Sequence, residues 1–439
     1  MRFRGITVMP GARARFLVGV VGAVSVAALI AGCSATSQSA QTTPTGRTAT
    51  STGAAPATTT TTGPTTTTAP TTAAPATPPT PVPVPASLSM RPVKGANGVD
   101  PTAPVVVTAG HGMLSSLAVT NPAGEQVTGR YSADRSTWTS TEDLGYGKTY
   151  DVVAVATGKI GAPARANSSF TTVQPRTLTY PSIFPGPGIT DVGVGQPIDV
   201  TFDESITDKA TAEKALVVTT SPPQLGAWHW MSDRDVQWRP KDYWRPATKV
   251  TLNADVYGKD LGNGVFGQED RTVSFKIHDD WRVIGSVANH TLTVYHNGAA
   301  VRTVPASFGK TSTPTHGGVH VIYQKFHLYL MNSCSYGICS GPSAYTNFHA
   351  YYAQRISGDG EFLHVNESTV YDQGRYNVSH GCINVSMAQG IWLYQHLDIG
   401  DIVDVQGGTP QLGIDDGYGA WNASWSQWLA GSALHQPTT

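Results

Sequence analysis

The chain has 439 residues and a mass of 46.3 kDa, enough for two to four domains at roughly 100–200 residues each. It carries 29 basic and 30 acidic residues, a formal net charge of -1, and only 13% of its residues are charged. This balance excludes a strongly basic protein that binds nucleic acid through bulk electrostatics. A hydrophobic share of 40% excludes a chain that is disordered throughout.

Residues 1–32 have the pattern of an export signal. Four arginines precede an uncharged run from Phe16 to Gly32, and a positive start, an apolar stretch and a small-residue exit are typical of a signal peptide. The exit, from Leu29 to Cys33, resembles the bacterial lipobox, in which the cysteine after the cleavage site is lipidated. We expect a lipid on Cys33 and an exported protein anchored at the cell membrane, facing the cell wall. The alternative is an ordinary signal peptide in which Cys33 is incidental.

A tether is expected over residues 33–86. Between Gln41 and Thr80, 19 residues are Thr and 7 are Pro, and Val, Leu, Ile and aromatic residues are missing. Such a segment cannot bury a core and should remain extended. At about 3.3 Å per residue its reach exceeds ~100 Å, which suits a protein that works at a distance from the membrane.

Residues 87–175 and 176–278 are predicted to form two immunoglobulin-like β-sandwiches. Short β-rich segments alternate there with turn signals and lack a helical period, which is typical of antiparallel sandwiches. The segments are Pro104–Thr108, Leu117–Thr120, Thr149–Thr157, Ser169–Val173, Pro197–Phe202, Ala215–Thr219, Val236–Arg239, Lys249–Tyr257 and Arg271–Ile277.

Two features of the second sandwich allow a binding interpretation beside a structural one. Its four tryptophans either stack on carbohydrate or, as we favour, pack in the core; they are Trp228, Trp230, Trp238 and Trp244. A loop with Asp260, Asn263 and Gly264 offers oxygen ligands for a hard cation such as calcium. It is too short and too poor in carboxylates for an EF-hand, and a plain turn is favoured.

Residues 279–407 have a different pattern, which predicts a β-rich domain with one short helix. The strands form a meander with a hairpin turn at His296-Asn297-Gly298. A helix is expected from Met387 to Leu397, because Gly400 lies just past its apolar period. Asp401–Val405 follows as a closing strand. Residues 408–439 carry Trp421, Trp425 and Trp428 and are expected to form a helical packing anchor.

The four cysteines separate into three roles. Cys33 is assigned to the lipid, and Cys334 and Cys339 lie five apart in a Gly/Ser-rich loop. In an oxidising exported setting these two are positioned to pair, with two free thiols as the alternative. Cys382 is left single, and an unpaired cysteine in an exported protein calls for an explanation.

The surroundings of Cys382 indicate nucleophilic chemistry. The segment reads Ser379-His380-Gly381-Cys382-Ile383-Asn384, and His364 lies eighteen residues earlier. A nearby imidazole and the N-terminus of the following helix should lower the pKa of the thiol. Gly381 lets backbone N–H groups approach a reacting carbonyl. The combination suits acyl transfer through a thioester.

This pattern resembles the L,D-transpeptidase signature, in which a His and a spacer precede Ser/Thr-His-Gly-Cys-x-Asn. The resemblance covers roughly Ala96 to Gly431. Tandem immunoglobulin-like modules before the catalytic domain are similar to the mycobacterial branch of the family.

The resemblance implies roles for individual residues. Cys382 would be the nucleophile and His364 its base, oriented by the Val365 carbonyl. The N–H groups of Gly381 and Cys382 would face the oxyanion. The remaining residues would shape the cleft or bind the substrate stem: His380, Asn384, Met331, Tyr336, Tyr345, Asp359 and Gly360. A Cys334–Cys339 disulfide is not part of the signature and would stiffen the loop that carries Tyr336.

The implied reaction is bond exchange in peptidoglycan. The thiol would attack a tetrapeptide stem between diaminopimelate and terminal D-alanine, and the diaminopimelate amine of a second stem would resolve the thioester. Carbapenem β-lactams would acylate the same cysteine, and no metal or organic cofactor is required. The enzymatic alternative is an L,D-carboxypeptidase, in which water resolves the thioester. The non-enzymatic alternative is a wall-binding lipoprotein.

Other interpretations of the same residues are weaker. A zinc site from His364, His380 and Cys382 lacks a fourth ligand, and a buried inert thiol does not explain the constellation around Cys382. A papain-like protease normally places its cysteine before its histidine. Four further histidines have no partner pattern and are expected to face solvent or pack; they are His316, His320, His327 and His349.

Overall fold

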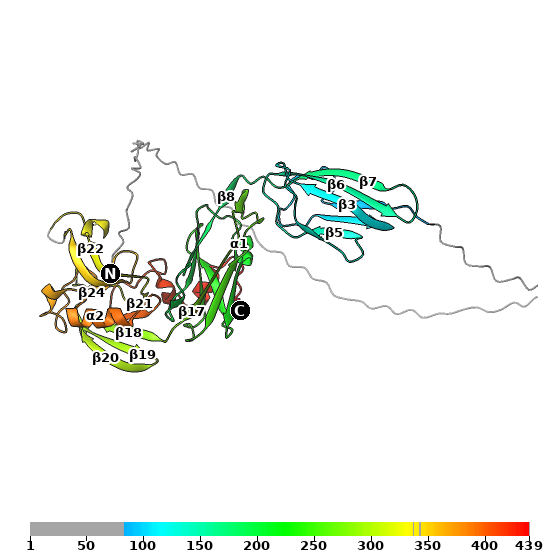
Figure 1. Ribbon diagram of the computed structural model, residues 1–439. Coiled ribbons are helices and arrows are strands. Elements are labelled where there is room, and N and C mark those ends of the chain that lie inside the picture. The colour runs from blue at the N-terminus through cyan, green and yellow to red at the C-terminus, as the bar shows by residue number, and fades with distance from the viewer. Residues whose placement is uncertain (1–82, 337, 342–343, 439) are drawn as a thin grey trace, which may run out of the picture. The chain divides into compact units, whose positions relative to one another are not determined.

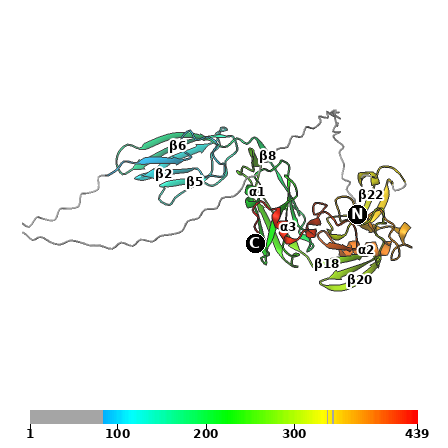
Figure 2. The ribbon, with the colours of Figure 1, turned by 180° about the vertical axis from the view of Figure 1, so that it is seen from behind.

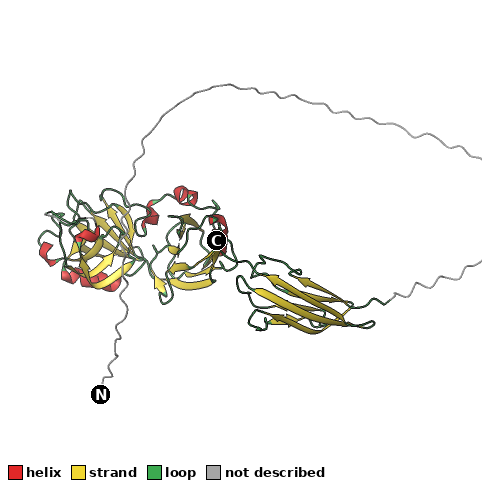
Figure 3. Ribbon diagram, turned by 90° about the horizontal axis from the view of Figure 1, so that it is seen from above, coloured by secondary structure: helices red, strands yellow, loops and turns green. Residues whose placement is uncertain are grey.

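The computed structural model describes residues 83–336, 338–341 and 344–438, and these are mainly β (Figures 1 and 3). The expected signal peptide, Cys33 and nearly all of the tether therefore lie outside the described residues. Within the described ranges, no helix has the length and apolar character needed to cross a membrane.

The first sandwich consists of two antiparallel sheets, with strand orders β1-β2-β5-β4 and β3-β6-β7. Alternate residues of β6 face inward, and Tyr150, Val152, Ala154 and Ala156 are buried there. This period of two is the reason the segment forms a strand between core and solvent. The strands are β1 (Ser87–Arg91), β2 (Val106–Gly110), β3 (Gly112–Thr120), β4 (Gly129–Tyr131), β5 (Thr137–Ser140), β6 (Thr149–Gly158) and β7 (Ala164–Thr171).

The second sandwich has two four-stranded sheets, β10-β17-β15-β12 and β13-β14-β11-β9, and a parallel pair of β16 and β8. Its strands are β8 (Thr177–Thr179), β9 (Pro181–Phe184), β10 (Asp191–Val192), β11 (Ile198–Phe202), β12 (Leu216–Ser221), β13 (Gly226–Trp230), β14 (Asp235–Pro240), β15 (Lys249–Ala254), β16 (Val265–Gly267) and β17 (Arg271–Ile277). The helix α1 (Lys209–Ala215) was not predicted; Asp208 caps it by accepting from the Thr211 amide.

Both special features of this sandwich have structural roles. The four tryptophans are 8% exposed or less and belong to its core, so core packing is the correct interpretation. In the loop, Asp260 accepts from the Gly262 amide, and the Asn263 carbonyl accepts a 2.8 Å hydrogen bond from the Arg176 guanidinium. Because a cationic side chain already binds this carbonyl, the loop is a turn and we withdraw the calcium interpretation.

The third domain has a five-stranded sheet, β20-β19-β18-β26-β21, and a four-stranded sheet, β22-β23-β24-β25. The predicted helix is present as α2 (Met387–His396), and the predicted turn at Asn297-Gly298 connects β19 to β20. The strands are β18 (Trp281–Ser286), β19 (Thr291–His296), β20 (Ala299–Pro305), β21 (Gly318–Val321), β22 (Gln324–Met331), β23 (Phe348–Arg355), β24 (Phe362–Val365), β25 (Ile383–Val385) and β26 (Ile402–Gln406). Short 3-10 helices are η1 (Ser333–Tyr336) and η2 (Glu367–Thr369).

The C-terminal segment contacts two domains. It contains η3 (Gly419–Asn422) and α3 (Trp425–Ala430), and α3 lies beside strands of the second sandwich in Figure 2. The indole of Trp428 donates to the Ala227 carbonyl of β13, and the Asn422 side chain donates to Val319 of β21. The predicted anchor therefore packs on the second sandwich through α3 and on the third domain through η3.

Candidate active site

The strand pair β24 and β25 brings the two principal candidate residues together. These strands are parallel, with His364 opposite Asn384, and Cys382 directly precedes β25. The helix α2 begins only at Met387, after β25. The expectation that a helix N-terminus supports the thiol was therefore wrong, because a strand separates the two.

Cys382 borders a cavity of about 280 Å³. His364 and Asn384 line it from the strand pair, Met331 lines it from the end of β22, and Tyr345 lines it from the segment between β22 and β23. The other lining residues are Phe348, Asn366, Ser368, Thr369, Val378, Ser379 and His380. Of the predicted residues, the cavity thus gathers the proposed nucleophile, its base and much of the expected cleft.

His364 is held in one neutral form. Its ring is buried, 3% exposed, and its Nδ1 donates to the Val365 carbonyl at 2.9 Å. Because a carbonyl can only accept, the proton of the neutral ring resides on Nδ1 and Nε2 keeps a lone pair. Burial lowers the pKa of His364 to about 4, and the carbonyl only partly opposes this. At neutral pH the ring is therefore an unprotonated base.

Cys382 is a neutral thiol in this arrangement. Burial raises the pKa of Cys382 to about 12; the charges of Glu361 and Asp359 add to the rise, and the Phe362 amide opposes it. The thiol faces the Gly360 carbonyl at 3.8 Å. The expectation of a lowered thiol pKa was wrong, because the neighbouring imidazole is uncharged and cannot offset desolvation.

The two backbone N–H groups next to the thiol, those of Gly381 and Cys382, differ in their hydrogen bonding. Gly381 has φ +129°, a conformation that favours glycine. Its N–H donates to the Ser379 hydroxyl at 3.2 Å, and that hydroxyl donates to the Cys382 carbonyl at 2.6 Å. The prediction that the Gly381 N–H faces an oxyanion is therefore wrong for this arrangement. The Cys382 N–H has no hydrogen-bond acceptor among the described residues.

A second cavity, of about 140 Å³, also borders Cys382. Tyr345, His380 and Cys382 line both cavities. The predicted Asp359 and Gly360 line only the second, together with Thr313, Pro314, His316, Ser333, Ile338, Glu361 and Gly381. Cys382 thus borders two cavities, and only the second is also lined by the side chains of Asp359 and Glu361.

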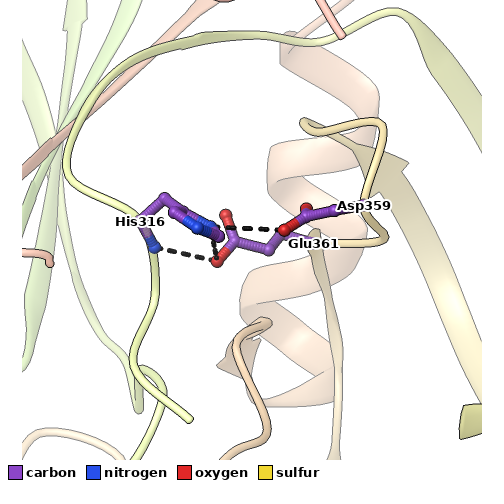
Figure 4. Close-up of side chains that lie close together, drawn as sticks. All are labelled: His316, Asp359 and Glu361. Carbon is purple, nitrogen blue, oxygen red and sulfur yellow. Dashed lines mark hydrogen bonds and ion pairs between the residues drawn. The ribbon is translucent and has the colours of Figure 1, made fainter. Parts of the chain in front are cut away.

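A charged cluster borders the second cavity (Figure 4). His316 Nδ1 lies 3.1 Å from Glu361 and 3.5 Å from Asp359, and the buried His320 lies 3.2 Å from the other Glu361 oxygen. The expectation that His316 and His320 lack partners was wrong. Glu361 lies more than forty residues after both in the sequence, so no local pattern indicates the contact.

The members of this cluster shift one another's pKa values. The Glu361 hydrogen bond raises the pKa of His316 to about 9. Burial raises the pKa of Glu361, but the bonds from His316 and His320 outweigh burial and the net pKa is lowered. His316, Asp359 and Glu361 are ligand types for a metal ion and their atoms lie within 4.8 Å of one another. Because both Glu361 oxygens already accept from histidines, we describe the cluster as a hydrogen-bonded ion pair.

The loop over the cavities contains the expected disulfide, between Cys334 and Cys339. Next to it, the Ser333 hydroxyl accepts from the Tyr345 amide at 2.8 Å, and Met331 is buried, 1% exposed. The side chain of Tyr336 lies outside the described part of the chain, so its predicted role stays a prediction.

His380 is exposed and differs from His364 in its surroundings. Its Nε2 lies 3.2 Å from the Lys310 ammonium, and burial together with the Lys310 charge lowers its pKa. Lys310 comes from a loop seventy residues away and was not predicted to lie beside His380. His380 is thus a neutral cleft residue beside a cation.

The fold and this site define an L,D-transpeptidase-type acyltransferase. The family model for the L,D-transpeptidase catalytic domain matches residues 280–405, and the model for a bacterial Ig domain matches residues 96–260.

Two relatives match this chain over more than three quarters of its length. L,D-transpeptidase 2 of Mycobacterium tuberculosis (strain CDC 1551 / Oshkosh) is 42% identical over 345 residues, which is 77% of this chain and 83% of the relative. L,D-transpeptidase 5 of Mycobacterium tuberculosis (strain ATCC 25618 / H37Rv) is 36% identical over 365 residues, which is 81% of this chain and 79% of the relative. A solved L,D-transpeptidase in complex with imipenem is 33% identical, with a TM-score of 0.45, and covers 51% of this chain and 97% of its own. The chain belongs to the L,D-transpeptidase family.

Proposed function

We propose that this protein cross-links peptidoglycan by joining the diaminopimelate residues of two stem peptides through a thioester on Cys382. One observation carries the proposal: a buried thiol shares a cavity with a buried histidine whose unprotonated Nε2 has no hydrogen-bond partner among the described residues. Neutral imidazole is a general base suited to neutral pH. The pair can therefore form the nucleophile during attack instead of storing a thiolate.

The neutral pair defines a sequence of proton transfers. As Sγ attacks the carbonyl of diaminopimelate, the thiol proton moves to Nε2 of His364, and the carbonyl oxygen becomes an oxyanion near the Cys382 N–H. Collapse breaks the amide bond, and the imidazolium returns its proton to the departing D-alanine amine. The neutral amine of a second stem then attacks the thioester and gives its proton to His364. Collapse expels the Cys382 sulfur, which takes that proton back from the imidazolium and becomes the neutral thiol again.

The two cavities suit the two stems. The first is lined by amide and hydroxyl groups, and the buried Oδ1 of Asn384 has no partner among the described residues. A donor peptide with its own N–H groups would satisfy that atom. The second cavity presents the Asp359 carboxylate, which attracts the ammonium of an incoming diaminopimelate. We assign the donor to the first cavity and the acceptor to the second.

The competing reaction is hydrolysis, which would make the protein an L,D-carboxypeptidase. Cys382 is only 8% exposed, and a covered thioester is protected from bulk water. This favours transfer to a bound amine. Products separate the two: transfer gives a cross-linked dimer, whereas hydrolysis gives tripeptide alone.

The test incubates the full chain with disaccharide-tetrapeptide and analyses the products by mass. We expect dimer and free D-alanine from the wild type and neither from Cys382→Ala. A carbapenem should add to the wild type at Cys382 and leave Cys382→Ala unmodified. The double variant Cys334→Ser/Cys339→Ser is the control for removing other cysteines. Dimer formation by Cys382→Ala would refute the mechanism.

We further propose that the protein is exported and held at the membrane through lipid on Cys33, with the Thr-rich segment as a spacer. The support is the lipobox resemblance and the composition of residues 41–80. A lipid precursor fed to cells should label the wild type and leave Cys33→Ser unlabelled. Label on Cys33→Ser would exclude this anchor.

A further inference from the structure

The peptide between Gly381 and Cys382 is anchored on one face by a residue outside the signature. Thr315 is 1% exposed. Its hydroxyl donates to the Gly381 carbonyl at 2.6 Å and accepts from the Gly309 amide at 2.8 Å. Both hydrogen-bonding functions of this hydroxyl are therefore used inside the protein.

The bond at the Gly381 carbonyl determines where the Cys382 N–H points. In a trans peptide the C=O and the N–H lie on opposite sides of the chain, so a fixed carbonyl fixes the N–H of the next residue in the reverse direction. The Gly381 N–H is occupied by Ser379, whereas the Cys382 N–H has no acceptor among the described residues. Cys382 therefore supplies the amide of this pair that is free to bind a developing oxyanion.

Glycine at position 381 makes such an anchor necessary. A glycine adopts many backbone conformations at similar free energy, so the Gly381–Cys382 peptide could rotate if its carbonyl were released. Thr315 is itself held, because its carbonyl accepts from the Thr409 amide at 3.1 Å. The hydroxyl thus lies on a backbone segment that is itself hydrogen-bonded to another part of the domain.

We propose that Thr315 is a positioning residue for the oxyanion site: its hydroxyl holds the Gly381 carbonyl so that the Cys382 N–H points at the oxygen of the acylated carbonyl. This inference rests on the proposed function, since it assumes that Cys382 is acylated. Thr315 touches neither substrate nor thiol and acts only through the peptide.

The experiment compares Thr315→Val, which keeps the shape and removes the hydroxyl, with Thr315→Ser, which keeps the hydroxyl. Loss of an oxyanion donor costs about 10²–10³ in rate, and a displaced donor costs less. We expect Thr315→Val to slow acylation by a carbapenem roughly 10- to 100-fold, with KM for tetrapeptide little changed. Thr315→Ser should stay within about threefold of the wild type.

A matched control exists in the first sandwich. Thr172 is also 1% exposed, and its hydroxyl donates to the Gly145 carbonyl at 2.6 Å and accepts from the Lys148 amide at 3.0 Å. Thr172→Val removes the same kind of buried hydroxyl bridge far from Cys382 in the sequence. It should lower thermal stability without changing the acylation rate.

The decisive readout is the infrared stretch of the thioester carbonyl in the acyl-enzyme, isolated by ¹³C labelling. Loss of the Cys382 hydrogen bond strengthens the C=O bond, so the band should move to higher frequency in Thr315→Val and remain in place in Thr315→Ser. A slow Thr315→Val with the wild-type band would show a merely structural role and overturn the inference, as would a wild-type acylation rate.

The two proposals can fail separately. A wild type that is acylated but forms no dimer would refute the proposed cross-linking and leave the Thr315 comparison intact. A wild type that is not acylated at Cys382 would overturn both. Normal dimer formation by Thr315→Val at wild-type kcat would overturn only the role of Thr315.

Discussion

Two of the histidines that border the cavities around Cys382, His364 and His316, have surroundings that move their pKa values in opposite directions. His364 is buried against a backbone carbonyl, and its pKa falls to about 4. His316 is paired with Glu361, and its pKa rises to about 9. The first is neutral and the second is charged over the whole range between these values.

The difference shows that the partner, and not burial alone, selects the protonation state. A carbonyl orients a ring but carries no net charge, so it cannot offset the desolvation of an imidazolium. A carboxylate carries a full negative charge and can offset that desolvation. The proposed chemistry needs a neutral His364, because a base must be unprotonated, and a charged His316, because the charge of Glu361 must be neutralised. The Glu361 charge raises the pKa of Cys382, and an unpaired carboxylate there would oppose the developing thiolate.

The largest expected effect comes from removing the neutral histidine. His364→Gln keeps a polar side chain but has no base, so carbapenem acylation should slow by about 10²–10⁴. The exposed His349 offers a matched control, and His349→Gln should acylate at the wild-type rate. Equal rates in both variants would remove His364 from the mechanism. The rate is measured by mass spectrometry of the intact chain.

The second prediction concerns the removal of Glu361, the carboxylate partner of His316. Glu361→Gln leaves the charged His316 without its carboxylate partner. Because the His316 ring is partly exposed, the loss should be smaller than the roughly 3–5 kcal/mol of a fully buried ion pair. Calorimetry should show a lower melting temperature for the third domain, with the transitions of the sandwiches unchanged. Glu367→Gln, at an exposed site in the same domain, is the control. An unchanged melting temperature would mean that the cluster contributes little to stability.

Features that depend on residues close together in the sequence could be predicted from the sequence. The spacing of His364 and Cys382 and their resemblance to a known signature lead to the candidate base and nucleophile, which lie at the ends of short adjacent strands. The hairpin at Asn297-Gly298 and the helix from Met387 were predicted because turn residues and apolar periods are local signals. These features depend on neighbours in sequence.

The protonation states were not predictable in this way. The pKa of Cys382 depends on burial and on Glu361 and Asp359, and that of His316 depends on a residue 45 positions away. Thr315 reaches Gly381 across 66 positions. Such contacts arise only when the sheets pack, and single-sequence patterns carry no record of them. The short helix α1 was missed for another reason, since seven residues are too few to show a period.

A third prediction concerns stability against pH, where the two histidines should act at opposite ends. A folded pKa of about 4 for His364, against about 6.5 unfolded, means that the unfolded state binds more protons between these values. Stability is then lost as pH falls from about 6.5 to 4, by roughly 3 kcal/mol.

For His316 the sign is reversed. Its folded pKa of about 9 lies above the unfolded value, so its contribution is fully present below about pH 6.5 and is lost as pH rises through 9. The ring is partly exposed, and screening reduces the loss to about 1–2 kcal/mol. Denaturant unfolding of the third domain, repeated from pH 4 to 10, measures the acid loss of stability from His364 (the acid limb) and the alkaline loss from His316 (the alkaline limb). In His316→Gln the alkaline limb should flatten and the acid limb remain; loss of both limbs together would contradict the assignment.

The smallest expected effect comes from the disulfide, which contacts neither histidine. Cys334 and Cys339 are exposed and close a loop of only a few residues, so their link stabilises the domain by at most about 2 kcal/mol. Cys334→Ser/Cys339→Ser should acylate within a few-fold of the wild type, because the loop still covers the cavities through the Ser333–Tyr345 contact. The pH dependence should not move, since the partners of both rings are unchanged. Mild reduction of the wild type, which leaves Cys382 a thiol, should reproduce the variant; a shifted pH profile in either would show that the loop influences the histidines through the shared lining residue Tyr345.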